Sequence, residues 1–444
     1  MINLNNKQKF TYTLKAQNLT NKNLDHFSKK FVWEIKKDEE FIGGNFYKKF
    51  RDYFIKLDFN ININLNSFFK LIKKENYVSF LNAIFSCHEF VYHTPCNFKT
   101  TPITKVHHNF IVDMNSYGKY VNEALVSVGA ESFSRKLIGL PENMLNPAKF
   151  VEIVKHQFAS LKNIEIKVLN KQELAKKQMN LLLAVGQASN KENEPKLLSI
   201  SLKNNSKAKK IVLVGKGVCF DTGGLSLKSS NYLEGMQYDM SGAAIVVGTM
   251  FALASVKSTA NVTVLAPLVI NDIGSNGIKV SDVITSYSGQ TVEITNTDAE
   301  GRLILADSIT YAEKDLKADT IVTIATLTGA IEYALSDTFT PIWLTNNKQF
   351  DQFKKAADNA AELIWHMPMH FEYEAKMKSS KIADIVNSEK TKGAASSTAA
   401  CFLSFFRKKA NFVHLDIAST NEFNHSPLPI MLRTLFYLTK KVLK

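Results

Sequence analysis

Three continuous apolar runs, rich in β-branched residues, constrain the fold of this chain more than any other feature. They lie at Ile211–Gly215, Val262–Ala266 and Thr320–Thr326. A strand with one buried face alternates apolar and polar residues, whereas an uninterrupted apolar run indicates burial on both faces. Helical patterns separate the runs, for example from Asp239 to about Ala254. We therefore predict an α/β fold in which a central, mostly parallel sheet is flanked by helices.

The length of the chain predicts two domains, because one hydrophobic core seldom serves 444 residues. A helical pattern over Val121–Leu140 is broken by the segment Pro141–Pro147, which indicates a boundary nearby. We expect an N-terminal α/β domain at residues 1–130 and a C-terminal catalytic α/β domain at residues 131–444. The linker helix region lies at about 120–150. Short β-like runs indicate that strands also occur before the boundary.

The formal net charge of +14 raises the question of a nucleic-acid partner. Only five of the 55 basic residues are arginine. Arginine is the residue that forms bidentate hydrogen bonds to guanine and phosphate. The lysines are scattered along the chain. A solvated lysine surface is therefore favoured over a nucleic-acid footprint.

The expected compartment is the cytoplasm, and no membrane partner is expected. No apolar run reaches the roughly 18 residues of a membrane span, and the first seven residues do not resemble a signal peptide. The cysteines form no CxxC pair, which favours free thiols in a reducing compartment. They are Cys87, Cys96, Cys219 and Cys401.

Four carboxylates gather near the strand ends of the C-terminal half. Asp221 follows one apolar run, and Asp239 opens a helical pattern. Asp298 and Glu300 lie in the stretch Asn296–Arg302, where they point the same way if the backbone between them is extended. Oxygen ligands in this number suit manganese, magnesium or carboxylate-bound zinc, and two divalent cations would balance their charge.

The glycine-rich segment Val214–Lys228 allows two other interpretations. A phosphate-binding loop needs the pattern GxxxxGK[ST], which is absent here. The triplet Asp221–Gly223 is similar to the one in aspartic proteases, but those enzymes need two such carboxylates and no second copy occurs. A single aspartate is often only a helix cap or an ion-pair partner. The four carboxylates together favour a metal site.

Three blocks of sequence resemble the leucyl aminopeptidase family, the dinuclear cytosol aminopeptidases. They are Val214–Lys228, Met236–Gly242 and Asn296–Leu303, and the last block matches the family signature without a substitution. Weaker similarity extends from about Ser132 to Ala418. The resemblance implies an N-terminal domain similar to a macro domain, a C-terminal catalytic domain, and a homohexamer.

The resemblance also implies a role for individual residues. Two divalent metal ions, manganese or zinc, would be held by Lys216, Asp221, Asp239, Asp298 and Glu300. The implied catalytic residues are Lys228 and Arg302, of which Arg302 would hold a bicarbonate ion as the general base. The implied substrate pocket contains Met236, Thr326, Leu327 and Gly329.

The function expected from these residues is that of a metallo-aminopeptidase in intracellular peptide turnover. It would release leucine or other apolar residues from peptides with a free N-terminus, using water activated by two metal ions. A nucleic-acid-binding or regulatory protein on the same scaffold is the alternative. The segment Asn421–Ile430 departs from the family, which usually has a glycine-containing stretch there. The preference for the first side chain therefore stays open.

Overall fold

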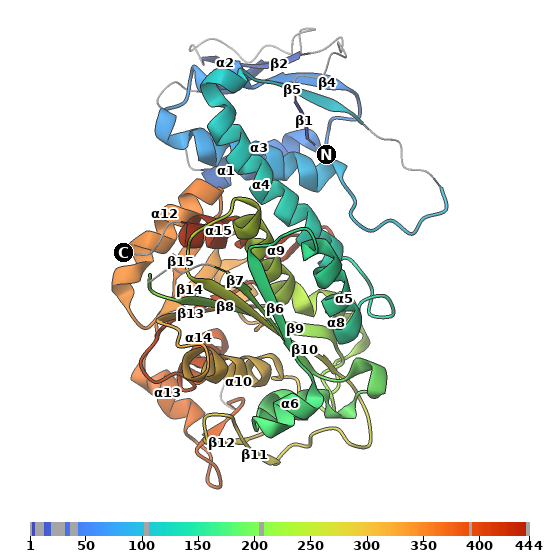
Figure 1. Ribbon diagram of the computed structural model, residues 1–444, viewed down its shortest axis with the longest axis vertical. Helices are drawn as coiled ribbons and strands as arrows, with labels where there is room; N and C mark the ends of the chain where they lie inside the picture. The colour runs from blue at the N-terminus through green and yellow to red at the C-terminus, as the bar shows by residue number, and fades with distance from the viewer. Residues whose placement is uncertain are drawn as a thin grey trace.

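The structure is a computed structural model that describes residues 2–4, 13–18, 32–35, 43–101, 106–203, 208–389 and 393–440. A smaller N-terminal α/β body lies above a larger α/β body, and helix α4 (Met114–Ile138) runs from the first into the second (Figure 1). The predicted α/β fold class is confirmed. The domain boundary predicted at residue 130 lies inside α4 and stays a prediction.

The N-terminal body contains a five-stranded sheet whose recorded pairings are all parallel. The strands are, in order across the sheet, β1 (Asn3–Leu4), β5 (His108–Ile111), β4 (Ile61–Asn64), β2 (Thr13–Asn18) and β3 (Val32–Ile35). The helical segments are α1 (Gly43–Phe54), α2 (Leu65–Phe69), η1 (Lys74–Asn76) and α3 (Tyr77–Tyr92). Buried aromatic rings join α1 to α3, for example Phe50 and Phe80 with centroids 6.0 Å apart. The expectation of strands in this part is confirmed.

The larger body is built on a nine-stranded mixed sheet. Its order is β15 (Ile364–His366), β14 (Thr340–Leu344), β17 (Asn411–Asp416), β13 (Thr320–Ala325), β8 (Ile211–Gly215), β10 (Val262–Asn271), β7 (Lys196–Leu202) and β6 (Ile164–Leu169), with β9 (Gly217–Asp221) beside β10. The four central strands β17, β13, β8 and β10 are parallel, whereas β14, β7 and β6 pair antiparallel to their inner neighbours. The three apolar runs are β8, β10 and β13, each fully buried as predicted.

Alternate side chains of the central strands pack into two separate cores, one on each face of the sheet. In β8, Ile211 and Leu213 join one core, and Val212 and Val214 join the other. The first core also receives α4, α5 (Pro147–Phe158), α9 (Ser241–Ser255), α12 (Phe350–Ala360) and α15 (Leu432–Lys440). The second receives α6 (Lys171–Lys176), α7 (Asn180–Val185), α10 (Gly301–Lys314) and α14 (Ala395–Ser404).

Shorter elements surround this sheet. They are η2 (Gly186–Ala188), η3 (Lys191–Asn193), α8 (Ser230–Leu233), η4 (Met236–Met240), β11 (Val283–Thr285), β12 (Thr291–Glu293), α11 (Ile331–Leu335), η5 (Asn347–Gln349), α13 (Phe371–Met377), β16 (Ile385–Val386), β18 (Glu422–Phe423) and β19 (Ser426–Pro427). The helical stretch Met236–Ser255 has the length and composition of a membrane span. Because 83% of its apolar window is buried inside the fold, it is only weak support for a span and is explained as a core helix.

Local sequence signals explain where several helices begin. The Asp113 side chain accepts a hydrogen bond from Asn115 N at the start of α4. Asn146 caps α5 in the same way, and Pro147 occupies its first turn, where no backbone donor is needed. Asn170 and Glu173 form a reciprocal capping box on α6. The break predicted after α4 is thus confirmed, because α5 has its own start signal.

Two helical glycines give a matched test of how closely α4 and α9 pack. A Cβ atom on Gly248 of α9 would overlap Ser134 Oγ and lie 2.7 Å from Leu432 Cδ1, whereas one on Gly129 of α4 would meet nothing within 4 Å. We expect Gly248→Ala to lower the free energy of unfolding by about 1–3 kcal/mol. Gly129→Ala should raise it by about 0.5–1 kcal/mol, since alanine favours a helix. Urea unfolding measures both, and equal effects would contradict close packing.

Candidate metal centre and catalytic cavity

The predicted ligand residues come from four separate segments around the carboxyl ends of the central strands. Lys216 lies between β8 and β9, Asp221 ends β9, and Asp239 lies in η4. Asp298 and Glu300 precede α10. Oxygen atoms of Asp221, Asp298 and Glu300 lie within 4.8 Å of one another. The fold therefore brings the predicted carboxylates together, as expected of a site at strand ends.

The route by which Asp298 and Glu300 converge differs from the prediction. The backbone between them is not extended, because Thr297 and Asp298 form a turn and Glu300 has helical angles of φ −76° and ψ −37°. The Thr297 hydroxyl donates to Gly223 O at 2.6 Å and accepts from Ser226 N at 2.7 Å. These bonds hold the turn against the loop that follows Asp221.

Lys216 is buried among polar partners. Its Nζ atom lies 2.7 Å from Asp239 Oδ1 and 2.9 Å from Glu300 Oε1, and it donates to Thr326 O at 2.9 Å. The lysine stem passes directly over Gly301, where a Cβ atom would lie 2.5 Å from Lys216 Cε. The glycine of the Asn296–Arg302 stretch is therefore required by this close approach.

Lys228 contacts the other two carboxylates. Its Nζ atom lies 3.0 Å from Asp221 Oδ2 and is also paired with Asp298 Oδ1. The opposite Asp221 oxygen, Oδ1, accepts from Gly223 N at 2.9 Å and from the Asn271 side chain at 2.8 Å. Each predicted lysine thus lies between two predicted carboxylates.

Burial and mutual repulsion disturb the pKa values of the carboxylates. Burial and the nearby Glu300 raise the pKa of Asp221 to about 6. Burial also raises the pKa of Asp239 well above its usual range, and that of Asp298 less strongly. Burial alone would raise the pKa of Glu300, but the charges of Lys216 and Lys228 outweigh it and lower the pKa. The cluster is thus short of positive charge.

The surrounding carboxylates raise the pKa values of both lysines. Burial alone would lower the pKa of Lys216, but Asp239 and Glu300 outweigh it and raise the pKa above the ordinary value. The pKa of Lys228 is raised in the same way, chiefly by Asp221. Lys216 can bind a metal only as a neutral amine. Divalent cations nearby would favour that form by repelling its proton.

The donor set fits divalent cations. Four ionised carboxylates carry a formal charge of minus four, and the two lysines return only plus two. Asp239 Oδ2 is buried and has no hydrogen-bond partner among the residues that the structure describes. A buried carboxylate oxygen without a partner is costly. Cations at this cluster would satisfy it and supply the missing positive charge.

Arg302 is buried in the first turn of α10, two residues after Glu300. Its Nη1 atom donates to Asn387 O at 2.7 Å, and its Nε atom has no acceptor within the described part of the chain. Burial lowers the pKa of Arg302 to about 10, although Glu300 and Asp416 oppose the shift. Across the described ranges no ion pair joins Arg302 to Asp298 or Glu300. The guanidinium therefore keeps a donor for a small anion.

A cavity of about 850 Å³ opens onto the cluster. Its walls include the five predicted metal ligands, Lys228 and the predicted pocket residues Met236, Thr326, Leu327 and Gly329. Arg302 is not part of its wall. Thr326 supports the cluster directly, because its hydroxyl donates to Asp239 Oδ1 at 2.7 Å.

Sequence reasoning missed three polar residues that position the site. Asn271 at the end of β10 binds both Asp221 and the backbone of Thr297. The side chain of Asn387 bonds to the backbone on both sides of Asp298, at Asn296 and Ala299. Asp416 at the end of β17 accepts from Leu327 N at 3.0 Å and from the Thr328 hydroxyl. A polar residue at the end of a buried strand was the available signal for Asn271 and Asp416.

Comparison with known proteins gives consistent results. A family model described as the catalytic domain of the cytosol aminopeptidase family matches residues 132–431. A probable cytosol aminopeptidase of Mycoplasma pneumoniae is 43% identical over 396 residues, which are 86% of this chain and 86% of that protein. One of Mycoplasma genitalium is 42% identical over 390 residues, covering 85% and 84%. One of Rickettsia bellii is 42% identical over 295 residues, covering 66% and 58%.

Proposed function

Because this chain belongs to the cytosol aminopeptidase family, whose members are metal-dependent aminopeptidases, we propose that it releases apolar N-terminal residues, leucine above all, from peptides. The carboxylate and lysine cluster on the wall of the 850 Å³ cavity carries this proposal. A cavity of this size accommodates a short peptide segment, and the cluster gives its wall a dense group of charges.

We propose that two divalent cations, manganese or zinc, complete the site. Lys216, Asp221, Asp239, Asp298 and Glu300 would hold them. Bound there, they would supply an activated water molecule and polarise the scissile carbonyl group. The free amino group of the peptide would be recognised at the same cluster, which restricts cleavage to the N-terminal residue.

Lys228 and Arg302 would serve as the catalytic residues. The Lys228 ammonium lies on the cavity wall between Asp221 and Asp298, so it can stabilise the oxyanion as the carbonyl is attacked. Arg302 would hold a bicarbonate ion with its Nε donor, which has no acceptor among the described residues. It lies at the start of α10, where backbone N–H groups also favour an anion. The three predicted sequence blocks contain no histidine, so this anion would accept the proton of the water.

The preference for leucine is a further part of the proposal. Met236, Leu327 and Gly329 line the cavity near the cluster. Methionine adapts to apolar side chains of different shape, and the glycine leaves room beside it. These walls would favour leucine and related residues over charged ones.

We propose that the chain works as a homohexamer in the cytoplasm. Apolar side chains near the cavity are unusually exposed, with Tyr232 at 71%, Tyr333 at 95% and Leu227 at 57%. Exposed apolar surface of this kind is typical of contacts between proteins. Contacts between copies of the chain would cover it.

A leucine anilide assay tests the proposed activity. The protein loaded with manganese or zinc should hydrolyse leucine p-nitroanilide, lose activity on treatment with a chelator, and regain it when metal is added back. Elemental analysis should find two metal ions per chain. A fully metal-loaded protein that is inactive from pH 7 to 9.5 would refute the proposal, and full activity without metal would refute the mechanism.

A further inference from the structure

Within the segment Asn421–Ile430, residues Glu422–Pro427 fold into a small hairpin beside the catalytic cavity. Strands β18 and β19 have two residues each, and the turn between them is formed by Asn424 and His425 with φ of 49° and 56°. Positive φ at both central residues is typical of a tight two-residue turn. Glu422, Phe423 and Asn424 form part of the cavity wall. The hairpin therefore borders the space that a substrate would enter.

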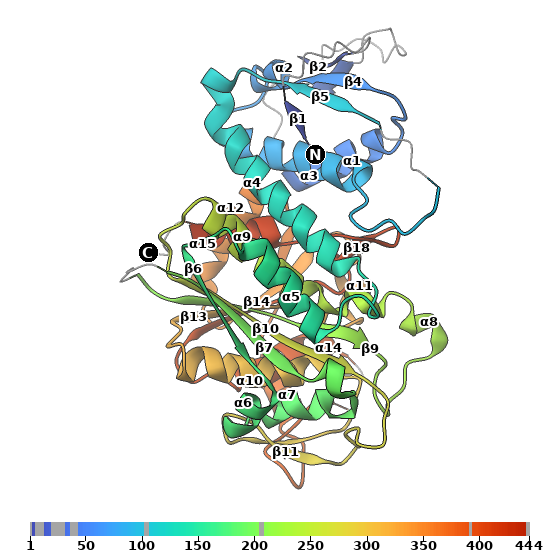
Figure 2. The ribbon, with the colours of Figure 1, turned by 45° about the vertical axis from the view of Figure 1, so that its right-hand side comes forward.

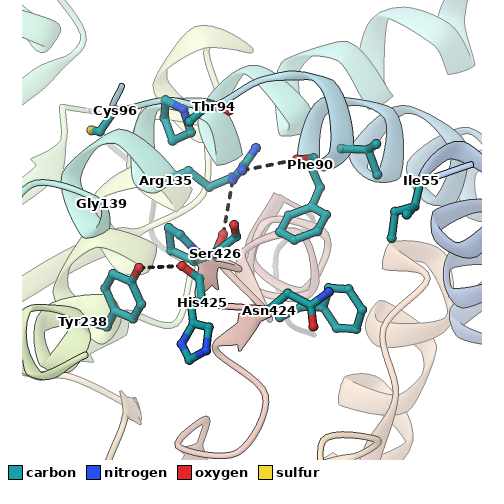
Figure 3. Close-up of a pocket in the computed structure, with 14 residues that line it drawn as sticks. Ile55, Phe90, Thr94, Cys96, Arg135, Gly139, Tyr238, Asn424, His425 and Ser426 are labelled. Carbon is teal, nitrogen blue, oxygen red and sulfur yellow. Dashed lines mark hydrogen bonds between the residues drawn. The ribbon is translucent and has the colours of Figure 1, made fainter. Parts of the chain in front are cut away.

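A second cavity of about 320 Å³ lies against this hairpin (Figure 3). Phe423, Asn424 and Tyr238 line both this cavity and the catalytic one. The Tyr238 hydroxyl donates to His425 O at 2.9 Å (Figure 3). Since Tyr238 directly precedes Asp239 in η4, this bond connects the hairpin to the element that carries a predicted metal ligand.

The N-terminal body holds the hairpin from the opposite side, where β18 lies at the junction of the two bodies (Figure 2). The Arg51 guanidinium of α1 lies 3.6 Å from the centre of the Phe423 ring. The Phe90 ring of α3 meets Phe423 edge-on, with centroids 6.1 Å apart. The Arg51 side chain is only 11% exposed, so this contact is largely shielded from water, which strengthens a cation–π interaction.

Arg135 of α4 joins the same elements. Its guanidinium donates to Phe90 O at 3.4 Å and to Pro427 O at 3.2 Å (Figure 3). It also donates to Glu89 O at 3.0 Å. One buried side chain thus binds the C-terminal end of α3 and strand β19 together. A pair of two-residue strands has little stability of its own. Its position must therefore be set by these neighbours.

We propose that Arg51 and Phe90 are positioning residues that set the side-chain preference at the first substrate position. They act by holding Phe423, and hence the Glu422–Asn424 section of the cavity wall, at a defined distance from Met236. Both residues lie outside the matched region 132–431, so the N-terminal body has a part in substrate selection. This inference rests on the proposed aminopeptidase activity.

The test compares how the metal-loaded variants discriminate between leucine and alanine p-nitroanilide. Arg51→Gln should lower the ratio of kcat/KM for leucine over alanine by roughly three- to tenfold, mainly through a higher KM for leucine. Arg51→Lys, which keeps the cation, should recover most of the ratio. Lys49→Gln is the matched control, because Lys49 is an exposed cation of α1 that faces Phe46 instead, and its ratio should equal that of the wild type.

A merely structural role would lower kcat/KM for both substrates equally and leave the ratio unchanged, and this result would overturn the inference. An equal change in Lys49→Gln would overturn it as well. If Arg51→Gln does not fold, Phe90→Leu gives the same comparison with an apolar replacement. An unchanged ratio of kcat/KM in that variant would again overturn the inference. An inactive wild type would refute the proposed function itself, whereas an active wild type with insensitive variants would refute only the role of Arg51 and Phe90.

Discussion

Replacing Asp298 by asparagine should lower kcat/KM for leucine p-nitroanilide by roughly 10³-fold, while the protein remains folded. The asparagine side chain keeps the size of the aspartate but removes one negative charge from a cluster that attracts cations. Asp298 also lies in a turn in which its backbone N–H donates to the Asn296 side chain at 2.9 Å, and the substitution leaves that bond in place. Elemental analysis should show fewer than two metal ions per chain.

Asp337→Asn is the matched control for this substitution. Asp337 also lines the cavity, but it is exposed and stands outside the carboxylate cluster. The same chemical change should therefore alter kcat/KM by less than about threefold, because an exposed charge is well screened by solvent. Equal losses in the two variants, or full metal content and activity in Asp298→Asn, would contradict the assignment of Asp298 as a ligand.

Replacing Arg433 by methionine should lower the free energy of unfolding by about 3–5 kcal/mol. Arg433 of α15 is buried, pairs with Glu131, and lies 3.2 Å from Glu362 Oε1. It also donates to Ala360 O at 2.8 Å and to the Ser86 hydroxyl of α3. Removal of the arginine would break both buried ion pairs and its hydrogen bonds to Ala360 and Ser86.

The loss of Arg433 would change the charge state of Glu131. Burial raises the pKa of Glu131 to about 7, and Arg433 is the main charge that opposes the rise. Without the arginine, Glu131 would take up a proton at neutral pH, and Glu362 would keep its three hydrogen bonds from Met431 N, Thr434 N and the Thr434 hydroxyl. The lost ion pairs and the lost bond to α3 should therefore dominate the measured change.

Urea unfolding of Arg433→Met should be compared with that of Lys440→Met. Lys440 lies on the same helix and pairs with Glu123 at 2.5 Å, but the two side chains are 26% and 20% exposed. Partly exposed ion pairs contribute little, so this control should change the free energy of unfolding by less than about 1 kcal/mol. An Arg433→Met variant as stable as the control would show that the buried pairs are not needed to hold α3, α4 and α15 together.

Local patterns explain why much of the fold was predictable. The runs that became β8, β10 and β13 are apolar without interruption, and this pattern needs no knowledge of the neighbouring strands. The break after α4 was also visible, because the Pro141–Pro147 segment contains the start signal of the next helix. The antiparallel edges of the sheet were not visible, since strand direction depends on connections that the apolar pattern does not encode.

The candidate site was likewise predictable only in part. The four carboxylates were identified by residue type and position, the two lysines were added by the family resemblance, and the structure brings all six together. The extended backbone expected between Asp298 and Glu300 was wrong, because hydrogen bonds from Thr297 to a distant loop impose a turn. Asn271 and Asn387 were missed for a related reason. Their importance lies in what they touch, and those partners are remote in sequence.

The sequence by itself determined which residues form the acidic cluster, and it predicted an oxygen-rich cation site with two lysines at the ends of buried parallel strands. Those features depend on residue type and on short-range pattern, which are fully present in the chain. Only the tertiary structure decided that the N-terminal body reaches the cavity, through the contact of Arg51 and Phe90 with Phe423. Such a contact depends on how the N-terminal body packs against the larger body. A local sequence pattern does not encode that packing.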